Sequence, residues 1–433
     1  MAIHIKGDDQ PRDMSPRFVI IGDGIAGSTA AEELREQAPE AEITVITEEG
    51  EPLYNRILIK EYAKGKMPEG PVGIHEENWY GDRDIDLQMD TYVTEVDEDA
   101  HEVHTHRGET YGYDKLLVAT GGTPSQLPVP GSGADGIHHF WTFEDAREIR
   151  EGMERSDNAV IVGAGLLGID LAAIAGAHDL DDAWYIMRGN RWWRYALSLE
   201  GAEIMHEAMR DMGIELVLES GVEEFETDPR GHVRATIDAN GDRYESRFVG
   251  AAIGLNFNTE LLQGTSVETD DGILTDEYMR TDAEDIYAAG DITRFYDPVI
   301  GDRAQNGSWG SAKEQGNLAA HTMLADEGFD VEPEEFRWVS SYSITHFDFP
   351  FLSFGYPTEA EEDAERKYDD TTWRRLAFKD GQLIGGVLIG DLAAQSKYKD
   401  IILSGADVAD EKEVLLQESF DIEDLSADIE LDD

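Results

Sequence analysis

The chain has 433 residues, about three times the length of a typical domain, so two or three domains are expected. Its 93 Asp and Glu against 35 Lys and Arg give a formal net charge of -58, which repels nucleic acid and anionic membranes. The hydrophobic fraction of 40% excludes general disorder, and the absence of cysteine excludes disulfides, thiolate metal sites and dithiol redox chemistry.

The acidic residues are spread along the whole chain. Molar salt relieves repulsion between exposed like charges, because the Debye length falls to about 3 Å at 1 M. The composition therefore resembles that of proteins from halophiles with concentrated KCl in the cytoplasm; an acidic protein from a mesophile is the alternative. The chain has no run of about 18 apolar residues, and its polar start, residues 1–16, lacks the apolar core of a signal peptide. We expect a soluble, cytoplasmic protein.

The first structured segment is a βαβ unit. Apolar residues 18–21 predict a strand, which ends in the turn Gly22-Asp-Gly24-Ile-Ala-Gly27; residues 28–36 predict a helix and residues 43–46 a second strand. Such a turn lets the backbone approach a pyrophosphate, whose charge the free N–H groups and the helix dipole stabilise. The residues expected to bind a dinucleotide here are Gly22, Gly24, Ile25, Ala26 and Gly27.

Two acidic residues follow the second strand. Glu48 comes about 20 residues after Gly27, where a carboxylate can accept hydrogen bonds from ribose hydroxyls. Glu49 is an equal alternative for this role.

A second copy of the unit begins at residue 159. A strand at 159–162 enters the turn Gly163-Ala-Gly165-Leu-Leu-Gly168, followed by a helix near 170–177 and a strand at 184–187. Between the copies are hairpin-like segments (92–106 and 109–113), an apolar run at 115–119 and a Pro-rich linker at 123–131. Because each motif follows a strand and opens a helix, two dinucleotides are expected. In the second copy, the expected site residues are Gly163, Gly165, Leu166, Leu167 and Gly168.

The second half of the sequence predicts further strands, a helix and an acidic C-terminal segment. Strands are expected at 214–218, 233–237 and 247–253, and a helix at 308–327. Residues 336–389 alternate apolar and polar positions, which indicates a small β-rich domain. Residues 404–433 contain twelve acids and one Lys, which predicts a solvated or loosely docked tail.

The segment Thr281-Asp-Ala-Glu-Asp-Ile-Tyr-Ala-Ala-Gly290-Asp291, with both glycine turns and Leu117-Val-Ala-Thr120-Gly121-Gly122, resembles the FAD-dependent pyridine nucleotide-disulfide oxidoreductase superfamily. Two stretches, 52–61 and 309–316, resemble its rubredoxin reductase, ferredoxin reductase and nitrite reductase flavin-subunit branch. The resemblance spans residues 18–389. It implies an α/β fold with two Rossmann-like dinucleotide-binding domains, arranged as in glutathione reductase, and a small β-rich α+β C-terminal domain. The expected domains are 17–125 and 250–334 for FAD, 126–249 for NAD(P)H, 335–403 as a C-terminal interface domain, and 404–433 as an acidic tail.

The resemblance also implies roles for single residues. Asp291 is expected to bind the FAD ribityl chain and Arg56 the FAD phosphates or flavin edge. Gln315 and Gly316 are expected to start a helix whose dipole faces the flavin. Lys60 and Asp170 are the expected catalytic pair beside the flavin. Further expected cofactor-binding positions are Val93, Ala119, Thr120, Gly121, Gly254 and Gly290.

Three arginines follow the position at which the ribose of the second dinucleotide is expected to bind. Met187 occupies the position that commonly holds an acid that recognises NAD, and Arg188, Arg191 and Arg194 follow it. Arginine pairs bidentately with phosphate, whereas a carboxylate repels a 2′-phosphate. This spacing resembles the NADPH-selecting arginines of glutathione reductases, so NADPH is favoured, with NADH as the alternative.

Electrons must leave the FAD directly, because the chain has no cysteine to receive them. We expect a small redox protein as the acceptor: a rubredoxin, a ferredoxin or an oxygenase component. The alternatives are a soluble NAD(P)H:quinone reductase and a slow FAD- and NADPH-binding redox sensor or scaffold. A homodimer is an open alternative for the oligomeric state.

The twelve His show no metal-binding spacing, so no metal is expected. The aromatic segment 346–351 is interpreted as core packing, with the open face of the flavin or a dimer interface as alternatives.

Overall fold

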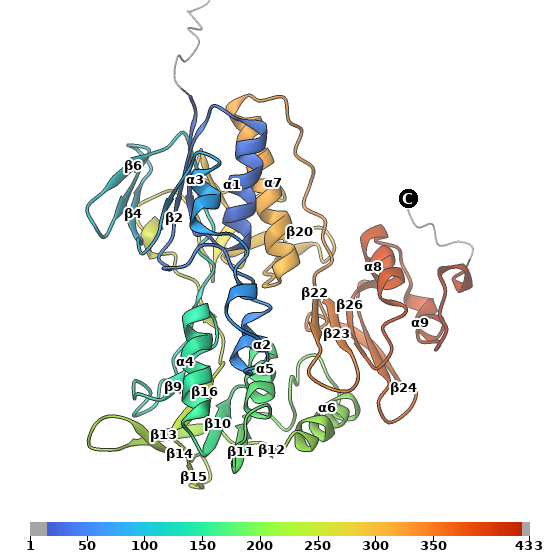
Figure 1. Cartoon of the computed structure of the whole chain (residues 1–433). Helices are drawn as coiled ribbons and strands as arrows, with labels where there is room; N and C mark the ends of the chain where they lie inside the picture. Colours follow the sequence, from blue (N-terminus) through green and yellow to red (C-terminus); the bar gives the residue numbers. More distant parts are fainter. Residues whose placement is uncertain (1–14, 427–433) are drawn as a thin grey trace, which may run out of the picture.

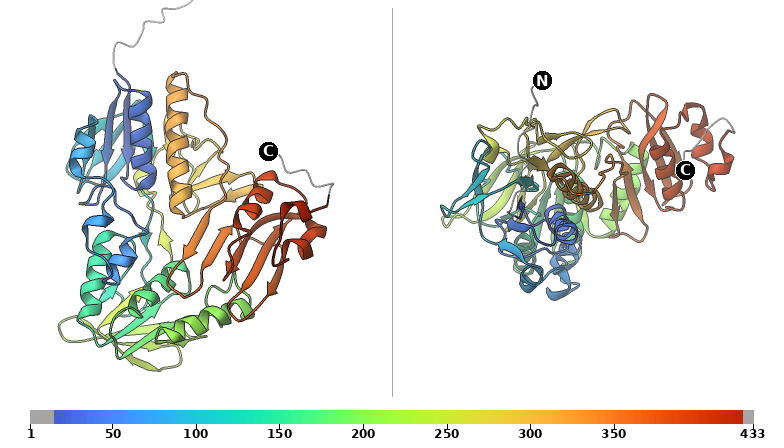
Figure 2. Two further views of the ribbon diagram at one scale, coloured as in Figure 1. Left: turned by 45° about the vertical axis from the view of Figure 1, so that its right-hand side comes forward. Right: turned by 90° about the horizontal axis from the view of Figure 1, so that it is seen from above.

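A computed structural model describes residues 15–426 of the chain. Two Rossmann-like units and a third, β-rich unit form three lobes (Figures 1 and 2). The first lobe, at the top of Figure 1, combines the blue and yellow-orange parts of the chain; the green second lobe lies below it, and the red third lobe lies beside both. No helix of residues 15–426 is long and apolar enough to span a bilayer.

The first lobe is built on a five-stranded parallel sheet in the order β19-β7-β1-β2-β3. Its central strand is buried on both faces: Phe18 and Ile20 pack in one core cluster and Val19 and Ile21 in another, which explains the continuous apolar run. The strands are β1 (Arg17–Ile21), β2 (Glu42–Ile46), β3 (Ile85–Gln88), β7 (Lys115–Val118) and β19 (Ile286–Ala288).

Helices and small sheets complete this lobe. Helices α1 and α7 lie side by side in both views (Figures 1 and 2). The remaining elements are α1 (Ile25–Gln37), α2 (Ile59–Ala63), α3 (Glu77–Gly81), α7 (Trp309–Glu327), the meander β4 (Val93–Asp97), β5 (Glu102–Thr105) and β6 (Thr110–Gly112), and the sheet β18 (Ile273–Thr275), β20 (Thr293–Asp297) and β21 (Asp302–Ala304).

The second lobe repeats the design. Its parallel sheet has the order β9-β16-β10-β11-β12, and the four strands from β16 to β12 correspond to β7, β1, β2 and β3 of the first sheet. The fifth strands differ, because β9 precedes β10 in the chain whereas β19 follows β7. The second lobe also carries a three-stranded meander. The internal duplication is therefore confirmed in three dimensions. Its elements are β9 (Ile137–His138), α4 (Phe143–Glu154), β10 (Asn158–Val162), α5 (Leu166–Ala175), β11 (Asp182–Ile186), α6 (Leu199–Asp211), β12 (Ile214–Val217), β13 (Val222–Thr227), β14 (Val233–Asp238), β15 (Arg243–Glu245) and β16 (Phe248–Ala251).

Two short strands join the first two lobes. The strand β8 (Thr123–Pro124), within the predicted linker, pairs with β17 (Leu255–Asn256), where the chain returns to the first lobe. The outgoing and returning segments thus lie together, as a first lobe built from two separate parts of the chain requires.

The third lobe is an antiparallel sheet in the order β22-β23-β26-β25-β24, so the predicted β-rich domain is confirmed. Its elements are β22 (Ser341–Ile344), β23 (Phe351–Gly355), β24 (Glu362–Lys367), β25 (Trp373–Lys379), β26 (Gln382–Ile389), α8 (Gln395–Ser404) and α9 (Lys412–Leu415).

The acidic segment after α8 packs on this sheet. Leu415, Leu416 and Phe420 are at most 3% exposed, and Arg374, itself 1% exposed, donates hydrogen bonds to the carbonyls of Gln417 (2.8 Å) and Glu418 (3.1 Å). The prediction of a solvated or loosely docked tail over 404–433 is therefore wrong up to residue 426, because apolar residues set among the acids fill the sheet face. Residues 427–433 lie outside the described part of the chain.

Candidate functional site

A cavity of about 720 Å³ lies where the three lobes meet, a volume within the range of about 300–1,000 Å³ usual for ligand sites. The first lobe contributes the glycine turn and α2, the second contributes Leu167 and Asp170 of α5, and the third contributes residues 341–343 of β22. The cavity can therefore form only when all three lobes are in place.

The first glycine turn supplies one wall. Gly22 has φ +108°, and a Cβ added there would lie 2.3 Å from the carbonyl oxygen of Ala119. A Cβ on Gly27 would lie 2.0 Å from the carbonyl oxygen of Gly22, whereas one on Gly24 would meet nothing within 4 Å. Gly24 also precedes α1 without any side-chain cap. The first and third glycines thus serve packing, and the second leaves the backbone open to a pyrophosphate at the helix N-terminus.

The second turn has the same construction. Gly163 has φ +114°, and its added Cβ would lie 1.9 Å from the carbonyl oxygen of Ala252; a Cβ on Gly168 would lie 2.0 Å from that of Gly163. Gly165 again has open space around it. Leu166 begins α5, and Leu167, beside it, reaches the wall of the central cavity. This second turn is therefore also shaped for a dinucleotide.

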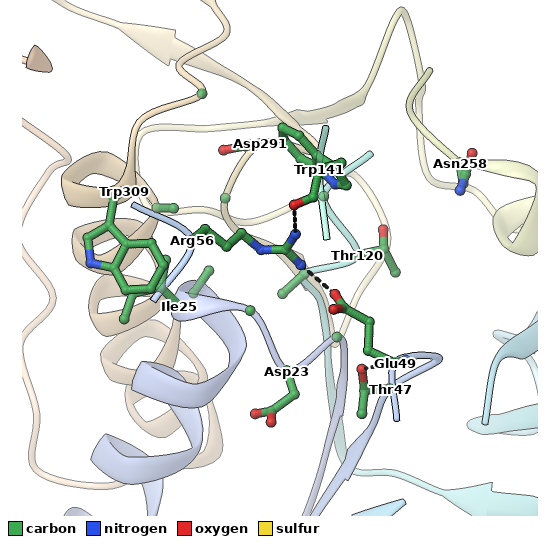
Figure 3. Close-up of a pocket in the computed structure, with 18 of the residues that line it drawn as sticks. Asp23, Ile25, Thr47, Glu49, Arg56, Thr120, Trp141, Asn258, Asp291 and Trp309 are labelled. Atoms are coloured by element: carbon green, nitrogen blue, oxygen red, sulfur yellow. Dashed lines mark hydrogen bonds and ion pairs between the residues drawn. The ribbon is translucent and has the colours of Figure 1, made fainter. Parts of the chain in front are cut away.

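Arg56 extends across the cavity between the positions of Trp309 and Glu49, as Figure 3 shows. Its Nη1 donates to the Trp141 carbonyl at 2.6 Å, and its Nη2 pairs with the Glu49 carboxylate. Burial raises the pKa of Asp291 to about 6, although the charge of Arg56 lowers it in part. Arg56 and Asp291 are thus brought to one cavity, as the resemblance implied.

The two acids after β2 differ in their surroundings. Glu49 is held by Arg56 and accepts a hydrogen bond from the Tyr54 hydroxyl at 2.6 Å. Glu48 is exposed at the cavity wall. Both acids line the cavity, and Glu48 is the more exposed of the two.

Some of the predicted cofactor-binding residues line the cavity and others do not. Thr120 has a buried Oγ1 without a hydrogen-bond partner among residues 15–426, so a polar ligand atom could satisfy it. Gly254 lies where the chain crosses between lobes, and its carbonyl accepts a hydrogen bond from the Ser125 N–H at 2.9 Å; it is not part of the cavity wall. The predicted positions that do line the cavity are Gly22, Gly24, Ile25, Ala26, Glu48, Glu49, Arg56, Lys60, Val93, Ala119, Thr120, Gly121, Leu167, Asp170, Gly290 and Asp291.

The predicted helix at 308–327 is confirmed as α7, but the prediction that Gln315 and Gly316 start a helix is wrong. Helix α7 begins at Trp309 after the cap Ser308, so the residues at the helix N-terminus beside the cavity are 307–310. Gln315 lies almost two turns later, where its buried Oε1 accepts hydrogen bonds from the Gly290 N–H (2.7 Å) and the Thr293 hydroxyl (2.9 Å). Gln315 therefore holds the turn before Asp291 in place, and Gly316 allows close contact between α7 and Ala26.

The predicted catalytic pair meets at the cavity. Lys60 Nζ lies 3.7 Å from Asp170 Oδ1, and the Tyr342 hydroxyl donates to Asp170 Oδ2 at 2.6 Å. Burial acts to raise the pKa of Asp170, but the hydrogen bond from His346 and the charge of Lys60 outweigh it, so the pKa is lowered. The carboxylate of Asp170 is consequently charged in spite of its burial.

Sequence reasoning missed His346 as a member of this cluster. Its side chain is fully buried, with Nε2 at 2.5 Å from Asp170 Oδ1 and Nδ1 at 2.7 Å from Lys64 Nζ. Burial lowers the pKa of His346, and the nearby lysines lower it further against the effect of Asp170. Only the histidine in an aromatic segment was visible in the sequence, and nothing local linked it to a residue 176 positions away.

The three predicted arginines, Arg188, Arg191 and Arg194, differ in their contacts and exposure. Arg191 donates through Nε to the Leu197 carbonyl (2.7 Å) and through Nη2 to the Arg194 carbonyl (3.0 Å), so it holds its own loop. Arg188 is exposed. Arg194 is exposed too and donates to the Tyr195 hydroxyl at 2.6 Å. Arg188 and Arg194 are therefore the better placed to meet a phosphate.

In the described part of the chain, no group of three or more acidic or histidine side chains is arranged to hold a metal ion.

A family model described as pyridine nucleotide-disulphide oxidoreductase matches residues 16–316. The assimilatory nitrate reductase electron transfer subunit of Bacillus subtilis (strain 168) is 27% identical over 412 residues, which cover 93% of this chain and 51% of that protein; the chain thus spans about half the length of this relative. Rubredoxin-NAD(+) reductase of Acinetobacter baylyi is 32% identical over 281 residues, 63% of this chain and 71% of that protein. The covalent putidaredoxin reductase-putidaredoxin complex has the same fold, with a TM-score of 0.85 at 23% identity over 93% of this chain and 96% of that one.

Proposed function

Because the chain belongs to the pyridine nucleotide-disulphide oxidoreductase family, whose members bind FAD and NAD(P)H, we propose that it passes a hydride from NADPH to FAD and electrons from FAD to a small redox protein. The observation that carries the proposal is the cavity where the lobes meet, which joins a dinucleotide turn to the Lys60 and Asp170 pair. Since the chain has no cysteine, no dithiol stands between flavin and acceptor.

The residues around the cavity fit FAD. The open backbone at Gly24 would hold the pyrophosphate, and the unpartnered Thr120 hydroxyl could bond a polar atom of the cofactor. We place Glu48 at the adenosine ribose, because Arg56 and Tyr54 already engage Glu49. Arg56 and Asp291 would contact the phosphates and the ribityl chain. When bound, FAD supplies a group that accepts a hydride and releases single electrons.

The other end of the cavity suits the flavin ring. Lys60 is held beside the cavity by the charged Asp170 carboxylate. The N-terminal residues of α7, 308–310, line the same cavity, so the helix dipole would stabilise negative charge that develops there. Bulky residues Phe140, Trp309 and Trp338 line the cavity and would exclude water from the reacting groups.

The second lobe is proposed to hold NADPH. Its glycine turn has the same open second glycine as the first, and Leu167 and Asp170 of the helix it starts reach the cavity. A nicotinamide carried by this lobe would therefore approach the flavin from the side of α5. Arg188 and Arg194 would pair with the 2′-phosphate, while Arg191 shapes the loop.

A small one-electron carrier is proposed as the acceptor. Relatives include a rubredoxin reductase and a reductase solved with putidaredoxin. A quinone reductase commonly reaches the bilayer through an amphipathic segment. Here the acidic segment 404–426 instead buries its apolar residues against the third lobe.

The test is an anaerobic titration of the purified protein in molar KCl. NADPH should bleach the absorbance of one bound FAD per chain, and oxidised rubredoxin or ferredoxin should restore it with a turnover above about 1 per second. A colourless protein that takes up no FAD would refute the proposal. Reoxidation by a quinone but by neither carrier would instead identify a quinone reductase. Stable charge-transfer absorbance without turnover would identify a redox sensor.

A further inference from the structure

Side chains of all three lobes meet at Asp170. This residue of α5 is only 4% exposed. From the third lobe, His346 Nε2 lies 2.5 Å from Asp170 Oδ1, and the Tyr342 hydroxyl donates to Asp170 Oδ2 at 2.6 Å. From the first lobe, Lys60 Nζ lies 3.7 Å from Asp170 Oδ1. Because a buried carboxylate stays charged only when donors and cations satisfy it, these contacts decide the charge of Asp170.

A second lysine fixes the tautomer of His346. Lys64, the C-cap of α2, places its Nζ 2.7 Å from His346 Nδ1 and forms an ion pair with Glu61 at 2.8 Å. An ammonium group can only donate, so Nδ1 of His346 accepts and Nε2 carries the hydrogen. The side chains of His346 and Lys64 are at most 3% exposed, so little water competes for these contacts. The imidazole is thus neutral, and every hydrogen of the row from Lys64 through His346 points toward Asp170.

The hydrogen bond from His346 opposes the effect of burial on Asp170. Burial acts to raise the pKa of Asp170, and the hydrogen bond from His346 is the largest of the effects that lower it, ahead of the charge of Lys60. The result is a pKa below the usual value. The titratable groups that face Asp170 are Lys60 and Lys64 from α2 and its C-cap, Tyr185 from β11, and Tyr342 and His346 from the third lobe.

The two tyrosines cannot take over the role of the histidine. Burial raises the pKa of Tyr185 and of Tyr342 far above the usual value, so both keep their hydrogens. The Tyr185 hydroxyl donates to a main-chain carbonyl at 2.5 Å, and Tyr342 already donates to the other oxygen of Asp170. A loss of His346 would therefore leave Asp170 Oδ1 with Lys60 alone.

We propose that His346 is a positioning residue that keeps Asp170 charged, so that Asp170 holds Lys60 beside the flavin. The inference rests on the proposed function and deepens it, because it adds a residue that does not itself line the cavity. Without His346, burial favours the protonated acid, and a neutral Asp170 no longer attracts the ammonium group of Lys60. The third lobe thus controls the charge of a pair that the first and second lobes supply.

The first experiment uses the cofactor-free protein. Histidine ¹⁵N NMR, with the His346 signal assigned by its loss in His346→Gln, should show a neutral imidazole protonated at Nε2 between about pH 8 and pH 6. A charged imidazole at neutral pH, or a hydrogen on Nδ1, would overturn the proposal, because His346 would then not be the neutral donor to Asp170 that Lys64 orients.

The second experiment follows the reduction of bound FAD by NADPH in the holoenzyme from about pH 9 to about pH 6. His346→Leu removes the donor. At pH 9, where Asp170 is still charged, the rate of this variant should be within about threefold of the wild type. Toward pH 6, as Asp170 takes up a proton, the ratio of the two rates should fall about tenfold. A ratio that is reduced but constant with pH would show a merely structural role and overturn the proposal, as would a ratio of one throughout.

The conservative variant His346→Gln should restore the wild-type behaviour. A glutamine amide can donate to Asp170 and accept from Lys64, so the ratio of its rate to that of the wild type should stay within about threefold and show no trend with pH. A trend as steep as that of His346→Leu would contradict the proposal, because the donor to Asp170 would then not be what matters.

A double variant tests whether His346 acts through Asp170. In Asp170→Asn the side chain is neutral at every pH, so its rate should match that of His346→Leu at about pH 6, and adding His346→Leu should cost no more than about twofold. A further loss of about tenfold would place the effect of His346 elsewhere.

The matched control is His321→Gln, since His321 pairs with Glu33 at 2.8 Å on the first lobe, away from the cavity. Its rate should equal that of the wild type at every pH, and a pH trend in this variant as well would overturn the assignment to His346. If neither NADPH nor NADH reduces the wild-type protein, it is the proposed function that fails, and the NMR experiment still decides the tautomer of His346.

Discussion

Replacing single glycines of the first turn by alanine should separate folding from cofactor binding. A methyl group on Gly27 would lie 2.0 Å from the Gly22 carbonyl oxygen and 3.1 Å from Ile20 Cγ2. The backbone of α1 would therefore have to move away from β1. A methyl group on Gly24 meets nothing within 4 Å, but it projects where a pyrophosphate would approach the turn.

The magnitudes follow from these contacts. Overpacking costs about 1–3 kcal/mol, and each kcal/mol lowers the melting temperature by about 2–4 °C in a domain of about 200 residues. Gly27→Ala should therefore lower the melting temperature of the cofactor-free protein by about 2–12 °C. Gly24→Ala should cost no more than about 1 kcal/mol, because alanine is only a weaker N-cap. The same variant should weaken FAD binding about tenfold or more, since the backbone can no longer contact the pyrophosphate closely.

Thermal melts of the cofactor-free proteins and fluorescence titration with FAD, both in molar KCl, measure the two effects. Gly70→Ala is the control, because Gly70 is exposed, lies outside the cavity and has nothing within 4 Å of its added methyl. If Gly27→Ala melts with the wild type, or if Gly24→Ala binds FAD with unchanged affinity, the division of the turn into packing glycines and an open glycine is incorrect.

The remaining predictions concern the second cofactor and pH. Arg188→Ala should raise the Kd for NADPH about tenfold, because one charge-assisted contact is lost, and leave the Kd for NADH unchanged. Arg191→Ala should weaken the binding of both nucleotides, because Arg191 holds its own loop. Calorimetry that finds the same affinity for NADPH in Arg188→Ala and the wild type contradicts this prediction. Burial raises the pKa of Asp23 to about 7, against the lowering effect of the hydrogen bond from Tyr80. Folding therefore favours the protonated acid, and this stability is lost as pH rises from about 4 to about 7. The melting temperature of Asp23→Asn relative to wild type should accordingly increase between about pH 5 and pH 8, and a constant difference would show that Asp23 does not titrate in this range.

Local signals predicted the two dinucleotide-binding lobes. Gly22 and Gly163 need backbone conformations or close contacts that only glycine tolerates, and each follows a strand buried on both faces, so the turns stand out in the sequence. Helix α4 could also have been found, since Thr142 and Asp145 form a capping box. The helix at 308–327 was also predicted correctly, but the helix start that the resemblance implied at Gln315 and Gly316 is wrong, because Ser308 caps α7 and Gln315 lies inside it.

The acidic C-terminal segment shows how composition can mislead. Its charge predicts solvation, yet Leu415 and Phe420 are buried against a sheet that the same sequence forms earlier in the chain. A few apolar side chains among acids stabilise docking only when a complementary apolar face exists, and whether it exists is a property of the folded third lobe.

The amino-acid sequence by itself determined the duplicated glycine turns, the strands and helices that carry them and the absence of a thiol relay, since each depends on residues close together in the chain. The tertiary structure alone decided that Lys60 reaches Asp170 and that His346 connects Asp170 to Lys64. These side chains come from three lobes, and their distances depend on how the lobes pack, which no periodicity or spacing within one segment encodes.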